Sequence, residues 1–132
     1  MKLSSIAEGK FHTSGLYKTI YGLRDLIARE AMGVYDNWDN DEDKNGICDE
    51  IAFVIESILS DNGINSTDYG HDGDNHASVV AYDDSEAFLI DIPYHTYESG
   101  GGYNWHKLPN ITITPDDVVI VSVDRPDWID NE

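Results

Sequence analysis

The spacing of the apolar residues changes once along this chain, and that change constrains the fold more than any other feature. Within residues 16–32 and 47–62, apolar side chains recur every three or four positions, which predicts two helices that each bury one face. The second half has short apolar runs bounded by turn residues, which predict strands at 77–82, 86–92, 110–114 and 118–123. This order predicts an α+β fold, with N-terminal helices packed on an antiparallel sheet of about four strands.

The residues between these runs predict where some elements begin and end. Ser14 has a side chain suited to cap the first helix, and Gly33 is predicted to end it. Residues 65–75 are polar and rich in turn formers, so we expect a loop there. The run at 118–123 is the most apolar of the strands, which predicts a central position in the sheet.

The charge of the chain is extreme, because 8 basic residues stand against 26 acidic ones and the net charge is −18. Such a surface repels nucleic acid and anionic lipid, and it suits a basic protein partner or a bound cation. The acidic residues are spread along the chain rather than collected in one block. We therefore expect one folded acidic domain over 1–132, with residues 1–13 as an N-terminal segment and the acidic tail 124–132 flexible.

Signals for membrane insertion or secretion are not visible in the sequence. No run approaches the ~18 apolar residues of a membrane-spanning helix, and the first residues contain no apolar leader. The single cysteine, Cys48, cannot form an internal disulfide, which is typical of a reducing compartment. These features predict a cytoplasmic protein that does not enter a membrane.

Three residues have the spacing of a cysteine-dependent catalytic site. Cys48 lies at the predicted start of the second helix, where free N–H groups and the helix dipole stabilise a thiolate. His76 opens a strand and Asp91 follows 15 residues later on the returning strand, so the two should be neighbours across the ladder. A thiol nucleophile needs a histidine base and a group that holds this base, so the residues predict a Cys-His-Asp triad.

A cysteine nucleophile also needs hydrogen-bond donors for the oxyanion that forms when a thiolate adds to a carbonyl group. The backbone N–H of Cys48 could be one donor, and the candidates for the other are Asn37, Trp38 and Asn40. Residues 94–105 are predicted to form a mobile loop rich in glycine and aromatic residues. Its aromatic side chains either line a substrate groove or pack on the sheet: Tyr94, Tyr97, Tyr103 and Trp105.

Two short motifs and their order carry a resemblance to a known family. Gly46-Ile-Cys48 precedes an apolar helix that closes on Gly63-Ile64, and His76-Ala77 precedes a strand, a turn and a strand with Asp91-Ile-Pro93. This arrangement resembles the transglutaminase-like branch of the papain-like superfamily. The resemblance implies a papain-like core with Cys48 as nucleophile, His76 as base and Asp91 as orienting acid. It also implies hydrolysis or transfer at amide bonds of a protein or peptide, as in proteolysis, deamidation or transglutamination.

The residues after Cys48 depart from the pattern of that family. Asp49 and Glu50 are carboxylates, and negative charge beside a thiol disfavours the thiolate. An inactive member of the family is therefore a second interpretation. A lone cysteine near an apolar helix is also often only a small buried side chain.

The stretch before Cys48 contains part of a calcium-binding pattern. The positions of an EF-hand loop that bind through side chains are partly matched here, by Asp41, Asp43, Asn45 and Asp49. The last position of such a loop normally holds a bidentate glutamate, and here it is Ala52. Catalysis by a cysteine requires no cofactor. Calcium is therefore a candidate for an additional ligand and not a requirement of the proposed chemistry.

Two classes of function fit these features. The first is a cysteine-dependent hydrolase or acyltransferase, which needs Cys48, His76 and Asp91 to converge in an open cleft. The alternative is a non-enzymatic acidic interaction protein, such as a nucleic-acid mimic or an inhibitor of a basic partner, or an inactive triad-fold module that binds calcium.

Overall fold

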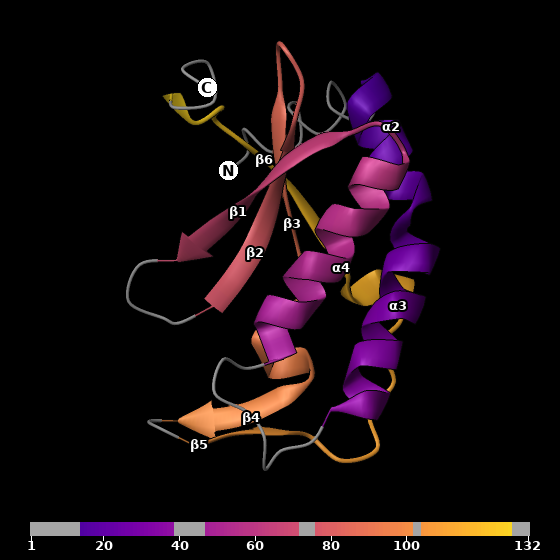
Figure 1. The fold of residues 1–132 in the computed structure, drawn as a ribbon, viewed down its shortest axis with the longest axis vertical. Coiled ribbons are helices and arrows are strands. Elements are labelled where there is room, and N and C mark those ends of the chain that lie inside the picture. Colours follow the sequence, from indigo (N-terminus) through magenta and orange to yellow (C-terminus); the bar gives the residue numbers. More distant parts are fainter. Residues whose placement is uncertain (1–13, 39–46, 72–75, 102–103, 128–132) are drawn as a thin grey trace.

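The computed structural model describes residues 14–38, 47–71, 76–101 and 104–127 (Figure 1). Its helices are α2 (Gly15–Gly22), α3 (Arg24–Asn37) and α4 (Ile47–Asp61). Its strands are β1 (Asn65–His71), β2 (His76–Tyr82), β3 (Ala87–Asp91), β4 (Glu98–Gly101), β5 (Asn104–Lys107) and β6 (Val119–Val123). Two short 3-10 helices, η1 (Tyr94–Thr96) and η2 (Pro115–Asp117), lie between strands.

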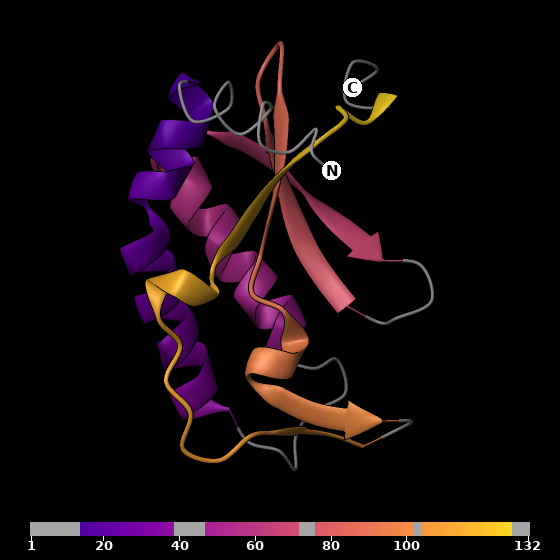
Figure 2. The same ribbon diagram turned by 180° about the vertical axis from the view of Figure 1, so that it is seen from behind.

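The helices cover a four-stranded antiparallel sheet with the strand order β1-β2-β3-β6. Helix α4 packs against β1 and β2, and α3 packs against α4 (Figure 1). Strands β4 and β5 form a separate ribbon at the end of the molecule where α4 begins (Figure 1). From behind, η2 lies against α3 before the chain enters β6 (Figure 2). The expected α+β arrangement of helices on a four-stranded antiparallel sheet is confirmed.

The first predicted helix is two helices in the structure. Ser14 caps α2 as expected, because its hydroxyl oxygen accepts a 2.8 Å hydrogen bond from the N–H of Tyr17. The chain leaves helical geometry at Leu23, with φ −93° and ψ 0°, and α3 follows. The prediction that Gly33 ends this helix is wrong, since α3 continues past it and buries Tyr35. Burial of an apolar face therefore outweighs the weak helix propensity of one glycine.

Helix α4 matches its prediction and supplies much of the core. Its buried residues are Ile47, Cys48, Ile51, Ala52, Ile55, Ile58 and Leu59. They belong to one core with Val79 and Ala81 of β2 and Phe88 and Ile90 of β3. Complete burial of one large apolar side chain stabilises the fold by about 1.5–3 kcal/mol. Gly63 ends the helix as expected, at φ 74°, and the N–H of Ile64 then donates to the carbonyl of Leu59.

The predicted loop at 65–75 is wrong for residues 65–71, which form β1. This strand is an edge of the sheet, and its register with β2 runs from Asn65 opposite Tyr82 to His71 opposite His76. Its residues are polar and show no apolar alternation, so the pattern gave no signal for a strand. Pairing of the backbone with β2 is what stabilises this exposed edge strand.

Three further predictions about the second half are corrected. The run at 118–123 is not central, since β6 is the second edge of the sheet and its Val119 and Val121 are exposed. Residues 110–114 form no strand. Residues 94–105 are not an irregular loop, because η1, β4 and part of β5 lie within them. Local apolarity thus predicted strands without predicting their order.

The hairpin of β2 and β3 agrees with its prediction. The carboxylate of Asp83 accepts hydrogen bonds from the backbone N–H groups of Ser85 and Glu86, at 2.8 and 2.9 Å. The register beyond this turn pairs Tyr82 with Ala87 and Val79 with Ile90. No helix in the described part of the chain is long and apolar enough to cross a membrane.

Candidate active site

Cys48 is the second residue of α4 and is 4% exposed. N–H groups in the first turn of a helix have no acceptor within the helix, and the helix dipole adds partial positive charge there. Asp49 and Glu50 follow Cys48 in the same turn and are exposed. Cys48 therefore lies among the N–H groups of the first turn, while the two carboxylates lie at the surface, where solvent screens their charge.

His76 and Asp91 are brought together by the β2–β3 hairpin, as the spacing predicts. His76 is the first residue of β2 and Asp91 the last of β3. The Nε2 atom of His76 lies 2.9 Å from Oδ1 and 2.8 Å from Oδ2 of Asp91. The exposed fractions of the two side chains are 6% and 13%. A carboxylate that accepts from Nε2 fixes the orientation of the imidazole ring.

Cys48 completes this group, because it interacts with the same imidazole ring. Burial alone would lower the pKa of His76, but hydrogen bonds to Asp91 and to Cys48, together with the negative charges of both, raise it to about 10. Both carboxylate oxygens of Asp91 lie on Nε2 of this ring. The structure thus assembles the three residues that the sequence predicts, with His76 protonated at neutral pH.

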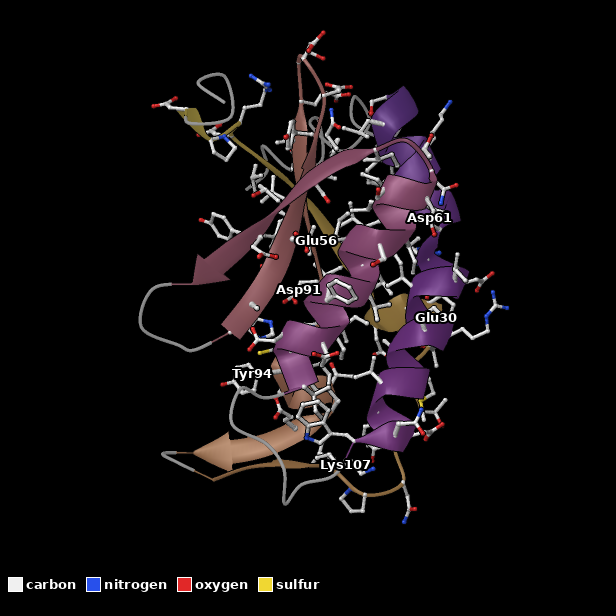
Figure 3. The ribbon with its side chains drawn as sticks, in the orientation of Figure 1. Glu30, Glu56, Asp61, Asp91, Tyr94 and Lys107 are labelled. Carbon is white, nitrogen blue, oxygen red and sulfur yellow. The ribbon has the colours of Figure 1, made fainter. Side chains whose placement is uncertain are left out.

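Tyr94 packs on the outside of this group. Its ring centroid lies 5.5 Å from that of His76, with the two planes tilted by 57°. Tyr94 is the first residue of η1, which begins soon after β3 ends at Asp91. Figure 3 shows Tyr94 near the end of the molecule from which α4 begins. This aromatic contact restricts the ring of His76 and helps to exclude water from it.

Tyr97, just after η1, is buried in the core that also contains Cys48. It is 0% exposed, and its hydroxyl oxygen has no hydrogen-bond partner among the described residues. Burial raises the pKa of Tyr97 first, and the negative charges of Cys48, Asp91, Glu98 and Asp49 raise it further. The sequence identified Tyr97 only as one of several aromatic residues in a glycine-rich segment, and nothing in its spacing indicated that it would be fully buried.

Of the three candidates for the second oxyanion donor, the structure shows a hydrogen bond for one, Asn37. The side-chain amide of Asn37 donates to the carbonyl of Gly33, at 2.9 Å, within its own helix. Trp38 packs against the apolar core. Asn40 lies outside the described residues, as does Tyr103.

The predicted calcium ligands are mostly outside the described part of the chain. Asp41, Asp43 and Asn45 fall in the undescribed segment 39–46, and Asp49 lies in the first turn of α4. Among the described residues, no group of three acidic, histidine or cysteine side chains could hold a metal ion. Calcium binding therefore stays a prediction from the sequence.

Comparisons with protein-family models, curated proteins and solved structures find no match to this chain. The resemblance to the papain-like superfamily thus rests on the order of Cys48, His76 and Asp91 and on the elements that carry them. The arrangement can hold a thiolate beside an imidazolium whose other nitrogen is fixed by a carboxylate. Such an ion pair is chemically suited to nucleophilic attack on a carbonyl carbon.

Proposed function

We propose that this chain is a cysteine-dependent hydrolase or acyltransferase that acts on amide bonds of a protein or peptide. In this proposal Cys48 is the nucleophile, His76 the acid and base, and Asp91 the acid that orients His76. The observation that carries the proposal is the shared imidazole: Asp91 lies 2.8 and 2.9 Å from Nε2, and Cys48 interacts with the same ring.

The reaction begins from the thiolate of Cys48 and the imidazolium of His76. The thiolate forms a carbon–sulfur bond to the amide carbonyl carbon, and the carbonyl electron pair moves onto oxygen. His76 then gives its proton to the leaving amine as the carbon–nitrogen bond breaks, which leaves a thioester on Cys48. Water or a second amine, deprotonated by His76, attacks the thioester and releases an acid or a new amide.

Access to the thiol sets a condition on the substrate. Cys48 and His76 are 4% and 8% exposed, so the acyl group reaches the sulfur only when neighbouring residues move. An extended peptide or a protein side chain that binds over the first turn of α4 would supply the binding energy for such a movement. This is a reason to favour a macromolecular substrate over a small free amide.

The papain-like fold is part of the same proposal. A helix that begins at the nucleophile packs on an antiparallel sheet, and the histidine and aspartate lie on adjacent strands of it. This order of helix and strands is what the family resemblance implies. We also propose a reducing compartment such as the cytoplasm, because a reactive lone thiolate is oxidised in an oxidising one.

A second candidate function follows from the charge of −18. A surface of this kind attracts a basic protein and would let the chain act as an acidic inhibitor or nucleic-acid mimic, without any chemistry at Cys48. A third candidate is an inactive triad-fold module that binds calcium through Asp41, Asp43, Asn45 and Asp49. A thermal-denaturation midpoint that is the same in calcium and in chelator removes this third candidate.

The experiment that separates the enzyme from the acidic interaction protein uses an activated ester. We expect p-nitrophenyl acetate to acylate Cys48 and release p-nitrophenolate, with acetyl recovered on the Cys48 peptide. Cys48→Ser should abolish the labelling and His76→Asn should slow it strongly. Labelling at the same rate in wild type and His76→Asn would exclude catalysis by this triad.

A further inference from the structure

Strand β6 is an edge of the sheet whose composition does not protect it from pairing with another chain. It pairs with β3 on one side, and no strand of the described chain pairs with its other side. In an antiparallel edge strand, every second residue points its N–H and C=O groups away from the sheet. The sequence of β6, Val-Ile-Val-Ser-Val, contains no charged residue, proline or glycine. Such an edge can accept a further strand.

The side chains of β6 also make one of its faces apolar. Val119 and Val121 lie on the same face, because side chains alternate along a strand, and they are 37% and 45% exposed. Ile120 lies on the other face and packs against the core. Among the large apolar side chains that the described structure exposes, only these two valines share one element. A partner that covers them removes apolar surface from water, which favours binding.

The opposite edge of the sheet is built differently. Strand β1 reads Asn-Ser-Thr-Asp-Tyr-Gly-His, so it is polar and contains a carboxylate and a glycine. Charged side chains and poor strand formers are the usual means by which an edge avoids pairing with other chains. Of the two edges of this sheet, β6 is therefore the one that suits a partner.

Acidic residues stand at both ends of β6. Asp116, in η2 before the strand, has a side chain that is 96% exposed, and Asp124 directly after the strand is exposed too. Arg24 lies 3.9 Å from Asp116, a distance at which an exposed ion pair is weak. The apolar stripe of Val119 and Val121 is thus bracketed by negative charge.

This charge decides which occupant fits the edge. Two copies of the chain, each with a net charge of −18, repel one another, so a pair of β6 strands from two copies is disfavoured. A positively charged segment is attracted by the same field and gains complementary contacts at both ends of the strand.

We propose that the free edge of β6 binds an extended segment of a basic partner protein, which adds to the sheet as a further strand. The backbone of the segment pairs with β6, and its alternate apolar side chains cover Val119 and Val121. Lysine or arginine residues toward its ends reach Asp116 and Asp124. This inference does not depend on chemistry at Cys48, so it stands or fails apart from the proposed function.

The probe is a fluorescent peptide, Lys-Arg-Val-Thr-Val-Thr-Arg-Lys, which combines alternating apolar residues with basic ends. We expect its fluorescence anisotropy to show binding that weakens as salt rises. Binding should also slow hydrogen exchange of the β6 backbone amides, because strand pairing protects them. The same peptide with methyl groups on alternate backbone nitrogens cannot pair along the strand, and we expect it not to bind.

Val121→Lys should weaken binding of the probe about 10-fold or more, because it removes an apolar contact and adds a charge that repels the peptide. Asn65→Lys is the matched control, since Asn65 is an exposed residue of the other edge strand and the change adds the same charge. It should change the affinity by less than about two-fold. Both positions are exposed, so we expect both variants to keep the wild-type denaturation midpoint.

Three results overturn the inference. The first is equal affinity of the probe for the Val121→Lys and Asn65→Lys variants, or no binding to wild type. The second is equal binding of a peptide in which glutamate replaces the basic residues. The third is a wild-type chain that sediments as a dimer while Val121→Lys sediments as a monomer, which would assign this edge to a second copy of the chain.

Discussion

The Nε2 atom of His76 lies 2.9 and 2.8 Å from the two carboxylate oxygens of Asp91, although 15 residues separate them in the chain. The β2–β3 hairpin produces this contact, since its register places Val79 opposite Ile90 and so draws the start of β2 to the end of β3. The same ring interacts with Cys48 at the start of α4. The three residues of the proposed triad thus come from three secondary-structure elements.

Replacement of Asp91 by asparagine should weaken the pairing of imidazolium and thiolate. The amide keeps the shape of the side chain but removes the negative charge that helps hold the proton on His76. We expect the rate of alkylation of Cys48 by iodoacetamide at pH 7 to fall roughly 10-fold or more.

Asp61→Asn is the control for that change, because Asp61 is an exposed residue at the opposite end of α4 (Figure 3). It removes the same charge far along the same helix, and it should leave the alkylation rate within a factor of two or so. A similar fall in both variants would mean that net charge, and not the contact with His76, controls the thiol.

The pKa of His76 predicts how stability depends on pH. The folded protein raises this pKa from 6.5 to about 10, so between these values the folded state holds a proton that the unfolded state has lost. The contribution of His76 to the free energy of unfolding is complete below pH 6.5 and is lost as pH rises through about 10. The free energy of unfolding should therefore fall with rising pH, by at most about 1.4 kcal/mol per unit.

The fall is best measured between about pH 8.5 and 10, where the cysteine of the unfolded chain has itself ionised. Urea denaturation at intervals through this range gives the free energy of unfolding directly. His76→Asn should remove the decrease. If the free energy of unfolding still decreases in this variant, titrating groups other than His76 cause the decrease.

Glu56 on α4 should make the protein less stable as pH rises from 4.5 to 7. The pKa of Glu56 is raised from 4.5 to about 7. Burial is the largest cause, followed by a hydrogen bond to Asp68 of β1 and by the negative charge of Asp68. The contribution of Glu56 to the free energy of unfolding is present in full below pH 4.5 and is lost as pH rises through 7. Glu56→Gln stays neutral, so we expect it to be more stable than wild type at pH 8 by roughly 0.5–1 kcal/mol.

Glu30→Gln is the comparison for Glu56, since Glu30 is an exposed carboxylate on α3 (Figure 3). Chemical denaturation at pH 5 and pH 8 should show a pH-dependent gain for the Glu56 variant alone. An equal gain in both variants would indicate relief of the overall negative charge and no special contact with Asp68.

Two glycine-to-alanine changes should act in opposite directions. Gly63 ends α4 with φ 74°, a left-handed conformation that costs an alanine about 1 kcal/mol, so Gly63→Ala should destabilise. Gly33 lies inside α3, and a methyl group there meets no atom within 4 Å. Gly33→Ala should stabilise by roughly 0.5–1 kcal/mol, measured as the shift in denaturation midpoint. The same sign in both variants would contradict the assigned backbone geometry.

The predictable parts of this fold are those in which side-chain pattern and tertiary packing agree. In α4 the apolar residues repeat with the helical period and face the core, and in the β2–β3 hairpin the turn residue Asp83 fixes the register. That register is why the contact between His76 and Asp91 could be predicted from spacing.

The remaining features depend on neighbours that are remote in sequence. β1 is polar and is held by its backbone pairing with β2, and the break at Leu23 interrupts a continuous apolar stripe. The edge position of β6 follows from topology, which apolarity does not encode. The complete burial of Tyr97, just after η1, depends on tertiary packing that the composition of its glycine-rich segment does not indicate.

The most direct test of the triad is the pH profile of Cys48 alkylation by iodoacetamide in wild type and in His76→Asn. We expect the wild-type thiol to be alkylated at neutral pH faster than an ordinary cysteine, whose pKa is near 8.5. In His76→Asn the rate should fall at neutral pH and recover only as pH approaches that value. Identical profiles for the two proteins would contradict the account.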